Sequence, residues 1–190
     1  MPSFDLRGIK IATYVNTAGT ITYTGATTVG DAMNCNVEIK FAEGRLYAES
    51  ALAEYMKLAT GGTVSIGVKY IPDTAQTTMF GCATSTRTAN TKSITGLKYT
   101  TKDAARYVGV AFYAPDVIDG VNKYSCVHIR KALFAPPAMQ YKTKDSNLTF
   151  QTPTTTGEFM ADDSTEKELI ETGIADTEAD AIAWVTEVLE

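Results

Sequence analysis

Apolar and polar residues alternate along three stretches of the chain, and this period of two is typical of a β-strand with one buried face. The stretches are residues 36–42, 64–70 and 107–114. Less regular apolar runs predict further strands at residues 9–15, 20–24, 123–134 and 148–160. The polar run at residues 83–93 is either a loop or a hairpin with strands near Arg87 and Ile94. The body of the protein is therefore predicted to be mainly β.

Turn-forming residues separate these stretches. They predict turns at Gly19, residues 43–45, 60–63, 115–116 and 119–120, Pro136-Pro137 and residues 145–147. A helix is predicted over residues 73–80, because Pro72 precedes it and Gly81 follows it. The stretch LYAESALAEYMKLATGG, residues 46–62, is ambiguous, and its composition favours a helix by propensity.

The character of the chain changes after Met160. A short helix is predicted from Ser164 to about residue 171, with Gly173 ending it. A second helix is predicted over residues 178–189, with Thr177 as its N-cap. We expect it to pack on the sheet body through an apolar stripe of Ala181, Trp184, Val185 and Val188. We therefore divide the chain into a β-rich domain, residues 1–160, and an acidic helical segment, residues 161–190.

Charge is distributed unevenly between these two parts. Residues 158–190 contain eleven acidic residues and one basic residue, Lys167, so their net charge is −10. The total for the chain is −5, which leaves +5 on residues 1–157. This asymmetry fits a solvated acidic face. It also fits attraction between the acidic end of one subunit and the basic body of a neighbour, which salt would weaken.

The composition is that of a folded domain, with 44% apolar and 21% charged residues in a chain of 190. The three cysteines, Cys35, Cys82 and Cys126, are widely spaced and odd in number. We therefore expect neither a disulfide framework nor a zinc site, and the pattern fits a reducing cytoplasm. No run approaches the roughly 20 apolar residues of a membrane helix, and no signal core is present, so a soluble protein without a membrane partner is expected.

The sequence lacks the residue sets of common enzymes. His128 is the only histidine, and we expect it to be structural or exposed rather than catalytic. The pair Asp162-Asp163 is expected in a solvated loop, and Gly61-Gly62 in a turn rather than around a phosphate. No catalytic, cofactor-binding or metal-binding residue is therefore predicted.

Basic and aromatic residues are interleaved at one place in the body. The cluster consists of Lys98, Tyr99, Lys102, Arg106 and Tyr107. Such a pattern occurs in nucleic-acid-binding proteins. Here the charges are scattered, and we expect them to serve solubility.

Four stretches carry a further signal in this order: LYAESALAEYMKLATGGTVSIGV, RYVGVAFYA, YSCVHIRKALFAPPAMQYKTKDSNLTFQTPTTTGEFMAD and TEADAIAWV. The third contains a spaced pattern formed by Lys131, Phe134, Pro137, Thr143, Lys144, Gln151, Thr152, Pro153 and Gly157. Together, and in this order, the stretches resemble the major tail protein family of long-tailed bacteriophages, the tail tube proteins. The resemblance extends over most of the chain from about residue 32 onward.

This resemblance implies a β-sandwich or barrel-like subunit with a short flanking helix. Subunits of this family form rings, typically hexameric, which stack into a hollow tube that conducts DNA. The implied partners are copies of the chain itself and the tape measure, tail terminator and distal tail proteins, with DNA only in transit. The implied location is the tail of the virion, after assembly in the cytoplasm of the bacterial host, and no cofactor is implied.

Residues 42–70 and 148–160 are our candidate assembly segments, and residues 47–63 are expected to reach a neighbouring subunit or ring. Unpaired strand edges promote pairing with other chains, and a closed ring of subunits would satisfy them. The candidate assembly residues are Leu46, Tyr47, Leu52, Tyr55, Met56, Leu58, Gly61, Gly62, Thr152, Thr154 and Thr156.

Two other readings remain open. The ten tyrosines permit an exposed aromatic platform, as a carbohydrate-binding or adhesin-like β-sandwich would need. Within the tube reading, the chain also fits the inner tube of a contractile tail-like particle, which would need a sheath partner.

Overall fold

The computed structural model describes residues 5–48, 51–139, 141, 143 and 152–190. Within them the chain is mainly β with two short helices, which confirms the predicted fold class. In chain order the elements are β1 (Arg7–Thr17), β2 (Thr20–Thr28), β3 (Ala32–Ala48), β4 (Ala51–Val68), α1 (Asp73–Phe80), β5 (Ala83–Ala89), β6 (Lys92–Lys98), β7 (Tyr107–Ile118), β8 (Val121–Phe134), β9 (Thr154–Phe159), β10 (Ile170–Ala175) and α2 (Glu178–Glu187).

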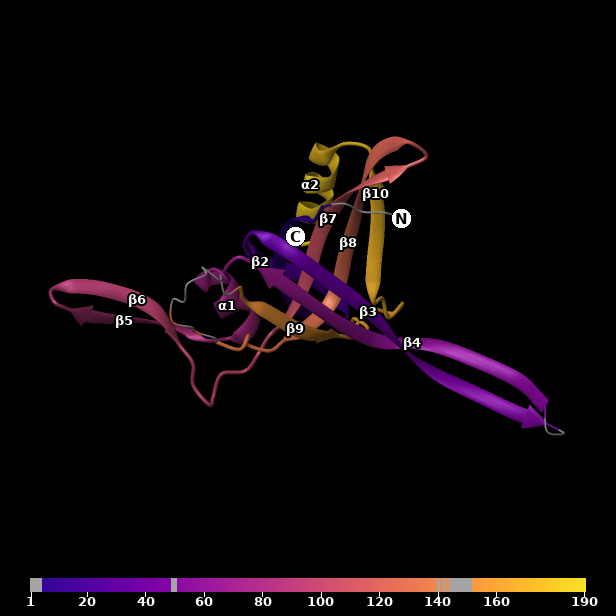
Figure 1. The fold of residues 1–190 in the computed structure, drawn as a ribbon. Helices are drawn as coiled ribbons and strands as arrows, with labels where there is room; N and C mark the ends of the chain where they lie inside the picture. Colours follow the sequence, from indigo (N-terminus) through magenta and orange to yellow (C-terminus); the bar gives the residue numbers. More distant parts are fainter. Residues whose placement is uncertain (1–4, 49–50, 140, 142, 144–151) are drawn as a thin grey trace.

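One large antiparallel sheet forms the body, with the strand order β2-β1-β7-β8-β9-β4-β3. The second edge of β8 is shared, because residues 124–129 pair with β10 and residues 132–134 pair with β9. Figure 1 shows β7, β8 and β10 standing together, while β3 and β4 cross below them at a steep angle. The sheet is therefore curled, and residues from β1 and β4 share one apolar interior.

The main hydrophobic core fills the inside of this curl. Its completely buried members include Ile9, Ile11, Val64, Ile66, Val108, Val110 and Ile129. Helix α1 covers it with Ala75, Met79 and Phe80, which confirms the helix predicted over residues 73–80. Gly81 ends the helix with φ at 68° and donates its N–H to Thr77 O. A Cβ at Gly81 would lie 2.3 Å from the carbonyl oxygen of Ala104, so this position requires glycine.

A second, smaller core lies on the outer face of the sheet, under α2. Ala181, Val185 and Leu189 are buried there against β1, β7 and β8, together with Tyr23 and Cys126. Thr177 caps the helix by accepting a hydrogen bond from Asp180 N at 3.2 Å. The predicted cap and the expected packing of this helix on the sheet are both confirmed.

Between β9 and α2, in residues 161–175, two predictions were wrong. Residues 164–171 form no helix; β10 begins at Ile170 and pairs with β8 instead. Asp162 is not in a solvated loop, because its buried carboxylate accepts from Ser164 N, Glu168 N and Arg130 Nε at 3.1, 3.0 and 3.2 Å. A carboxylate that binds these backbone amides holds the segment in a loop, and the free edge of β8 then takes up the following residues as a strand.

The β3–β4 hairpin corrects three more predictions. Residues 43–45 are not a turn, since β3 runs through them to Ala48, and residues 46–48 and 51–62 are strand rather than helix. Gly61 and Gly62 lie inside β4 and not in a turn. A Cβ at Gly62 would lie 2.1 Å from Glu38 O and 2.3 Å from the ring of Phe159, so glycine is needed where β9 crosses closely. Cross-strand pairing here overrides helix propensity.

Two further boundaries differ from the prediction. Residues 115–116 continue β7, and the turn lies at Asp119-Gly120, where both φ angles are positive. The predicted strand over residues 148–160 is observed only as β9, from Thr154 to Phe159. Residues 148–151, and the turn predicted at residues 145–147, lie outside the described residues.

Candidate self-association surfaces

The only histidine is part of the outer core. His128 is completely buried and packs edge-on against Tyr23, with ring centroids 5.2 Å apart. Neither of its ring nitrogens has a hydrogen-bond partner among the described residues. Burial lowers the pKa of His128 to about 3, with a smaller contribution from the positive charge of Arg130. The ring is therefore a neutral core group at ordinary pH and is closed to solvent.

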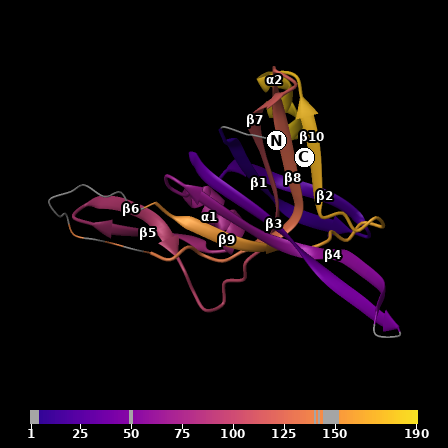
Figure 2. The same ribbon diagram turned by 45° about the vertical axis from the view of Figure 1, so that its right-hand side comes forward.

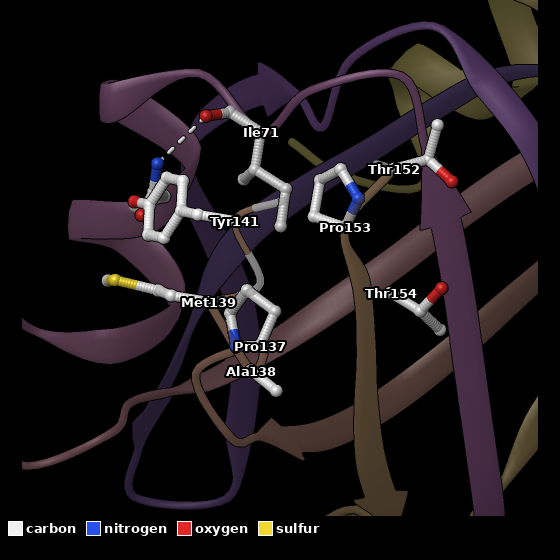
Figure 3. A pocket seen from close by; sticks show the side chains of 9 residues that line it. Ile71, Pro137, Ala138, Met139, Tyr141, Thr152, Pro153 and Thr154 are labelled. Atoms are coloured by element: carbon white, nitrogen blue, oxygen red, sulfur yellow. Dashed lines mark hydrogen bonds between the residues drawn. The ribbon is translucent and has the colours of Figure 1, made fainter. Parts of the chain in front are cut away.

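A shallow hollow of about 440 Å³ lies beside α1, as Figure 3 shows. It is lined by Ile71, Gln76, Pro137, Ala138, Met139, Tyr141, Thr152, Pro153 and Thr154. None of these nine side chains is charged. Gln76 donates its amide to Ile71 O at 2.8 Å and is thus already engaged. The hollow offers shape and apolar contact, and its described lining contains no carboxylate, amine, imidazole or thiol.

Two other absences hold for the described part of the chain. It contains no group of three His, Cys, Asp or Glu side chains placed to hold a metal ion. Neither of its helices has the length and apolar character needed to cross a bilayer.

Most of the candidate assembly residues lie on one projecting element, the distal half of the β3–β4 hairpin. We call residues 41–59 the apolar arm. Figures 1 and 2 show it extending well beyond the curled sheet. Its exposed apolar side chains are Phe41, Leu46, Tyr47, Tyr55, Met56 and Leu58. Leu52 also lies in the arm, opposite Tyr47 in the strand register.

The register of the arm separates its two faces. Ala42 pairs with Leu58, Gly44 with Met56 and Leu46 with Glu54. Residues that pair directly across an antiparallel ribbon share a face, so these side chains lie together. Leu46, Met56 and Leu58 are 58%, 63% and 59% exposed on this face. The face is an apolar strip with one acidic residue at its distal end.

The opposite face of the arm is polar and internally paired. Glu43 lies 3.4 Å from both Arg45 and Lys57. Lys57 also stands over the ring of Phe41, and Arg45 over the ring of Tyr55. The hydrogen bonds and positive charges around Glu43 lower the pKa of its carboxyl. The arm is therefore amphipathic, with one satisfied face and one apolar face open to solvent.

The remaining candidate residues lie elsewhere. Gly61 and Gly62 are buried at the base of the arm. Thr152 precedes β9, while Thr154 and Thr156 project from β9 into solvent. The alternate residue, Thr155, is buried and donates its hydroxyl to Ala135 O at 2.8 Å. Since β9 pairs with both β8 and β4, it can offer a partner its side chains but no free backbone edge.

The sequence did not reveal the free strand edges. In the described residues, β2 pairs only with β1 and β3 pairs only with β4. Their outer edges therefore carry unpaired backbone N–H and C=O groups, which favour pairing with another strand. Strand order determines which strands are edges, and alternation within one strand contains no information about that order.

No protein-family model matches the chain, and none of the curated proteins searched does so either. The apolar arm and the free edges are thus the features from which a function has to be inferred.

Proposed function

We propose that this protein is a structural subunit that self-assembles into stacked, hexameric rings and forms the hollow tail tube of a phage. The observation that carries the proposal is the apolar arm. Leu46, Met56 and Leu58 project far from the body on a single face that no other described part of the subunit covers. Burial of apolar surface contributes about 25 cal/mol per Å². Covering this face with a second copy would therefore stabilise an assembly substantially.

The free edges support the same proposal. If β2 of one copy lay beside β3 of the next, backbone hydrogen bonds would continue from subunit to subunit. Such a contact joins two different surfaces and is repeated by every copy, so it closes into a ring when the rotation permits. The polar side chains of Thr154 and Thr156 suit a subunit surface that faces water or a neighbour.

The proposal includes the partners and location that the family resemblance implies. The tape measure, tail terminator and distal tail proteins would meet the assembled tube, and DNA would only pass through it. The protein would be assembled in the host cytoplasm and reside in the tail of the virion. An inner tube of a contractile particle would use the same surfaces and would require a sheath in addition.

The test uses the two faces of the arm. Met56→Glu places a charge on the apolar face, whereas Ala59→Glu places the same charge on the opposite face of the same ribbon, since Ala59 pairs with Phe41. Negative-stain electron microscopy and sedimentation velocity would follow assembly of the full chain at increasing concentration. We expect rings or tubes from the natural sequence and from Ala59→Glu, but not from Met56→Glu. Far-UV circular dichroism verifies that both variants are folded.

Two results would count against this function. Normal tubes from Met56→Glu would remove the arm from assembly. A natural chain that stays monomeric at every concentration and salt, and binds glycans on an array, would favour the adhesin-like alternative.

A further inference from the structure

A second projecting element differs from the apolar arm in its surface chemistry. Strands β5 and β6 form a two-stranded sheet of their own, which we call the basic ribbon, residues 83–98. Asn90 and Thr91 connect them with positive φ angles, as a tight hairpin turn requires. Figure 1 shows the ribbon projecting from the side of α1. Eleven of its fourteen strand residues are exposed, and such an isolated hairpin is only marginally stable in water.

The positive charges of the basic ribbon lie on one face. Arg87 pairs with Ile94, Ala89 with Lys92 and Ala83 with Lys98. These pairs are two or four positions apart along each strand, so Arg87, Lys92 and Lys98 share a face with the exposed Ile94. The other face carries hydroxyl groups, including Thr86 and Thr95, whose side-chain oxygens are 3.1 Å apart. One face of the ribbon is thus cationic and the other neutral.

No acidic residue lies in the ribbon itself. Residues 83–102 contain four basic residues and no acidic residue. Beyond the ribbon, hydrogen bonds from Thr100 and the positive charge of Lys98 lower the pKa of the Asp103 carboxyl. Even so, Arg87, Lys92 and Lys98 form no ion pair with any residue that the structure describes. The ribbon therefore holds a concentrated positive charge without an ion-pair partner among the described residues of its own subunit.

The matching negative charge lies on α2. Many acidic residues of the C-terminal segment are used internally, since Asp162 and Glu168 bind Arg130 and Glu178 binds Arg7. Glu187 in α2 and the following Glu190 are exposed and have no described ion-pair partner. They stand at the helix C-terminus, where the helix dipole is negative and the last turn itself contains no basic residue. Lys10 of the same subunit reaches this turn and donates its ammonium to Thr186 Oγ1 at 2.8 Å, but it forms no ion pair with either glutamate. A further cation from a neighbour would therefore still be favourable.

We infer that the cationic face of the basic ribbon docks on the acidic C-terminal end of α2 in a second copy of the chain. The inference rests on the proposed self-assembly and names one of its contacts. Figures 1 and 2 both place the ribbon and α2 in separate parts of the molecule, so the contact is between copies. It joins two different surfaces and is therefore repeated from copy to copy, as a ring requires.

A second copy suits the ribbon better than a nucleic acid does. The chain itself supplies an acidic surface of opposite charge. In addition, residues 83–98 contain no aromatic side chain on which a base could stack. A contact of this kind would form quickly at low salt and weaken as salt rises.

The test is a charge exchange between the two surfaces. The ribbon variant carries Arg87→Glu and Lys92→Glu, and the helix variant carries Glu187→Lys and Glu190→Lys. Lysine at a helix C-terminus is favourable, so the helix variant should keep its fold. A matched control, Thr84→Glu with Ser93→Glu, adds the same charges to the neutral face of the ribbon. Sedimentation equilibrium of the full chain measures association at 50 and 500 mM NaCl, where the Debye length is roughly 14 Å and 4 Å.

We expect each variant to weaken self-association at least about tenfold at low salt, whereas the control stays close to the natural chain. A tenfold change corresponds to about 1.4 kcal/mol. Combining both sets of substitutions in one chain restores opposite charges across the contact and should recover association. Recovery by the combined variant cannot result from a ribbon that merely fails to fold.

Three outcomes would overturn the inference. The first is a combined variant that remains as weak as its parents. The second is normal rings or tubes from both variants; if Met56→Glu still abolishes them, the proposed function stands and only this contact is wrong. The third is a ribbon that binds a labelled 20-base-pair DNA, loses it in the ribbon variant and leaves self-association unchanged. A natural chain that never associates would overturn this contact and the proposed function together.

Discussion

The curled sheet and the two projecting ribbons use the same secondary structure for different ends. In the sheet, Ile11, Ile66 and Ile129 are completely buried, and helices cover both faces of it. In the apolar arm and the basic ribbon, nearly every side chain faces solvent. The sheet therefore provides the stability of the subunit, while the ribbons add surface without adding much core. A protein that keeps such ribbons has a use for their surfaces.

The two ribbons also differ from each other. The apolar arm presents Leu46, Met56 and Leu58 on one face, and the basic ribbon presents Arg87, Lys92 and Lys98. Contacts through the first should depend on apolar burial and respond weakly to salt. Contacts through the second should depend on charge and respond strongly to salt.

The largest expected effect is on the free energy of unfolding, which a substitution in the sheet should lower far more than one in the apolar arm. Phe134 is almost completely buried in the interior core, whereas Leu58 is 59% exposed in the arm. Phe134→Ala should lower the free energy of unfolding by about 3–5 kcal/mol, because it leaves a cavity. Leu58→Ala should change it by no more than about 0.5 kcal/mol. Urea unfolding followed by the fluorescence of Trp184 measures both. Equal losses would mean that the arm contributes to the stability of the subunit.

The next effect concerns the acidic segment that joins α2 to the sheet. Asp162→Ala should cost about 3 kcal/mol, because it leaves Arg130 partly buried without this partner and frees two backbone amides. Asp176→Ala is the matched control, since Asp176 pairs with Lys123 at the surface. It should cost less than about 1 kcal/mol. Urea midpoints compare the two, and similar values would place Asp162 among the surface ion pairs.

Asp162 also predicts acid sensitivity. Burial raises the pKa of its carboxyl, but the hydrogen bonds from Ser164 and Arg130 outweigh this and hold the pKa below the usual value. A lowered folded-state pKa adds stability above the unfolded-state pKa, and this stability is lost as the pH falls through the folded-state value. Asp162→Asn should flatten that part of the acid unfolding curve.

Local chemistry explains which elements the sequence predicted correctly. Pro72 and Gly81 bound α1, Thr177 caps α2, and Asp119-Gly120 closes the turn between β7 and β8. Each of these signals lies within a few residues of the structure that it determines. The errors arose where the deciding partner is distant in sequence. Residues 51–62 are strand because β3 pairs with them, and Asp162 is buried because Arg130 reaches it from β8.

The candidate assembly surface likewise depends on strand pairing between residues that the sequence alone does not match to each other. Leu46, Met56 and Leu58 were identifiable as apolar residues in a candidate assembly segment, but their common face was not. That face depends on the register shift between Lys40 and Phe41, which begins the regular pairing of the arm. The cationic face of the basic ribbon likewise appears only once Ala89 is paired with Lys92.

Because His128 is buried in the core under α2, it should make the stability of the protein depend on pH. Burial lowers its folded-state pKa to about 3, and an unfolded histidine titrates near 6.5, so folding favours the neutral form. The resulting stability is complete above about pH 6.5 and is lost as the pH falls toward 3. Between pH 7 and pH 5 the loss should be about 2 kcal/mol. His128→Phe should remove this slope, as urea unfolding at several pH values would show. A slope that persists in the variant would have to come from carboxylates, since the chain has one histidine.

The smallest expected effect tests whether α2 unfolds together with the sheet or separately from it. Thr177→Ala removes the side-chain oxygen that accepts from Asp180 N, and loss of such a cap costs about 1 kcal/mol. Thr177→Ser keeps the oxygen and should restore the natural stability. Because Val185 and Leu189 are buried against the sheet, the loss should appear in the single global transition, seen equally by Trp184 fluorescence and by far-UV circular dichroism. If Trp184 instead reported an earlier, separate transition, α2 would be an independent appendage. The acidic end of α2, on which the basic ribbon of a neighbour is proposed to dock, would then move relative to the sheet.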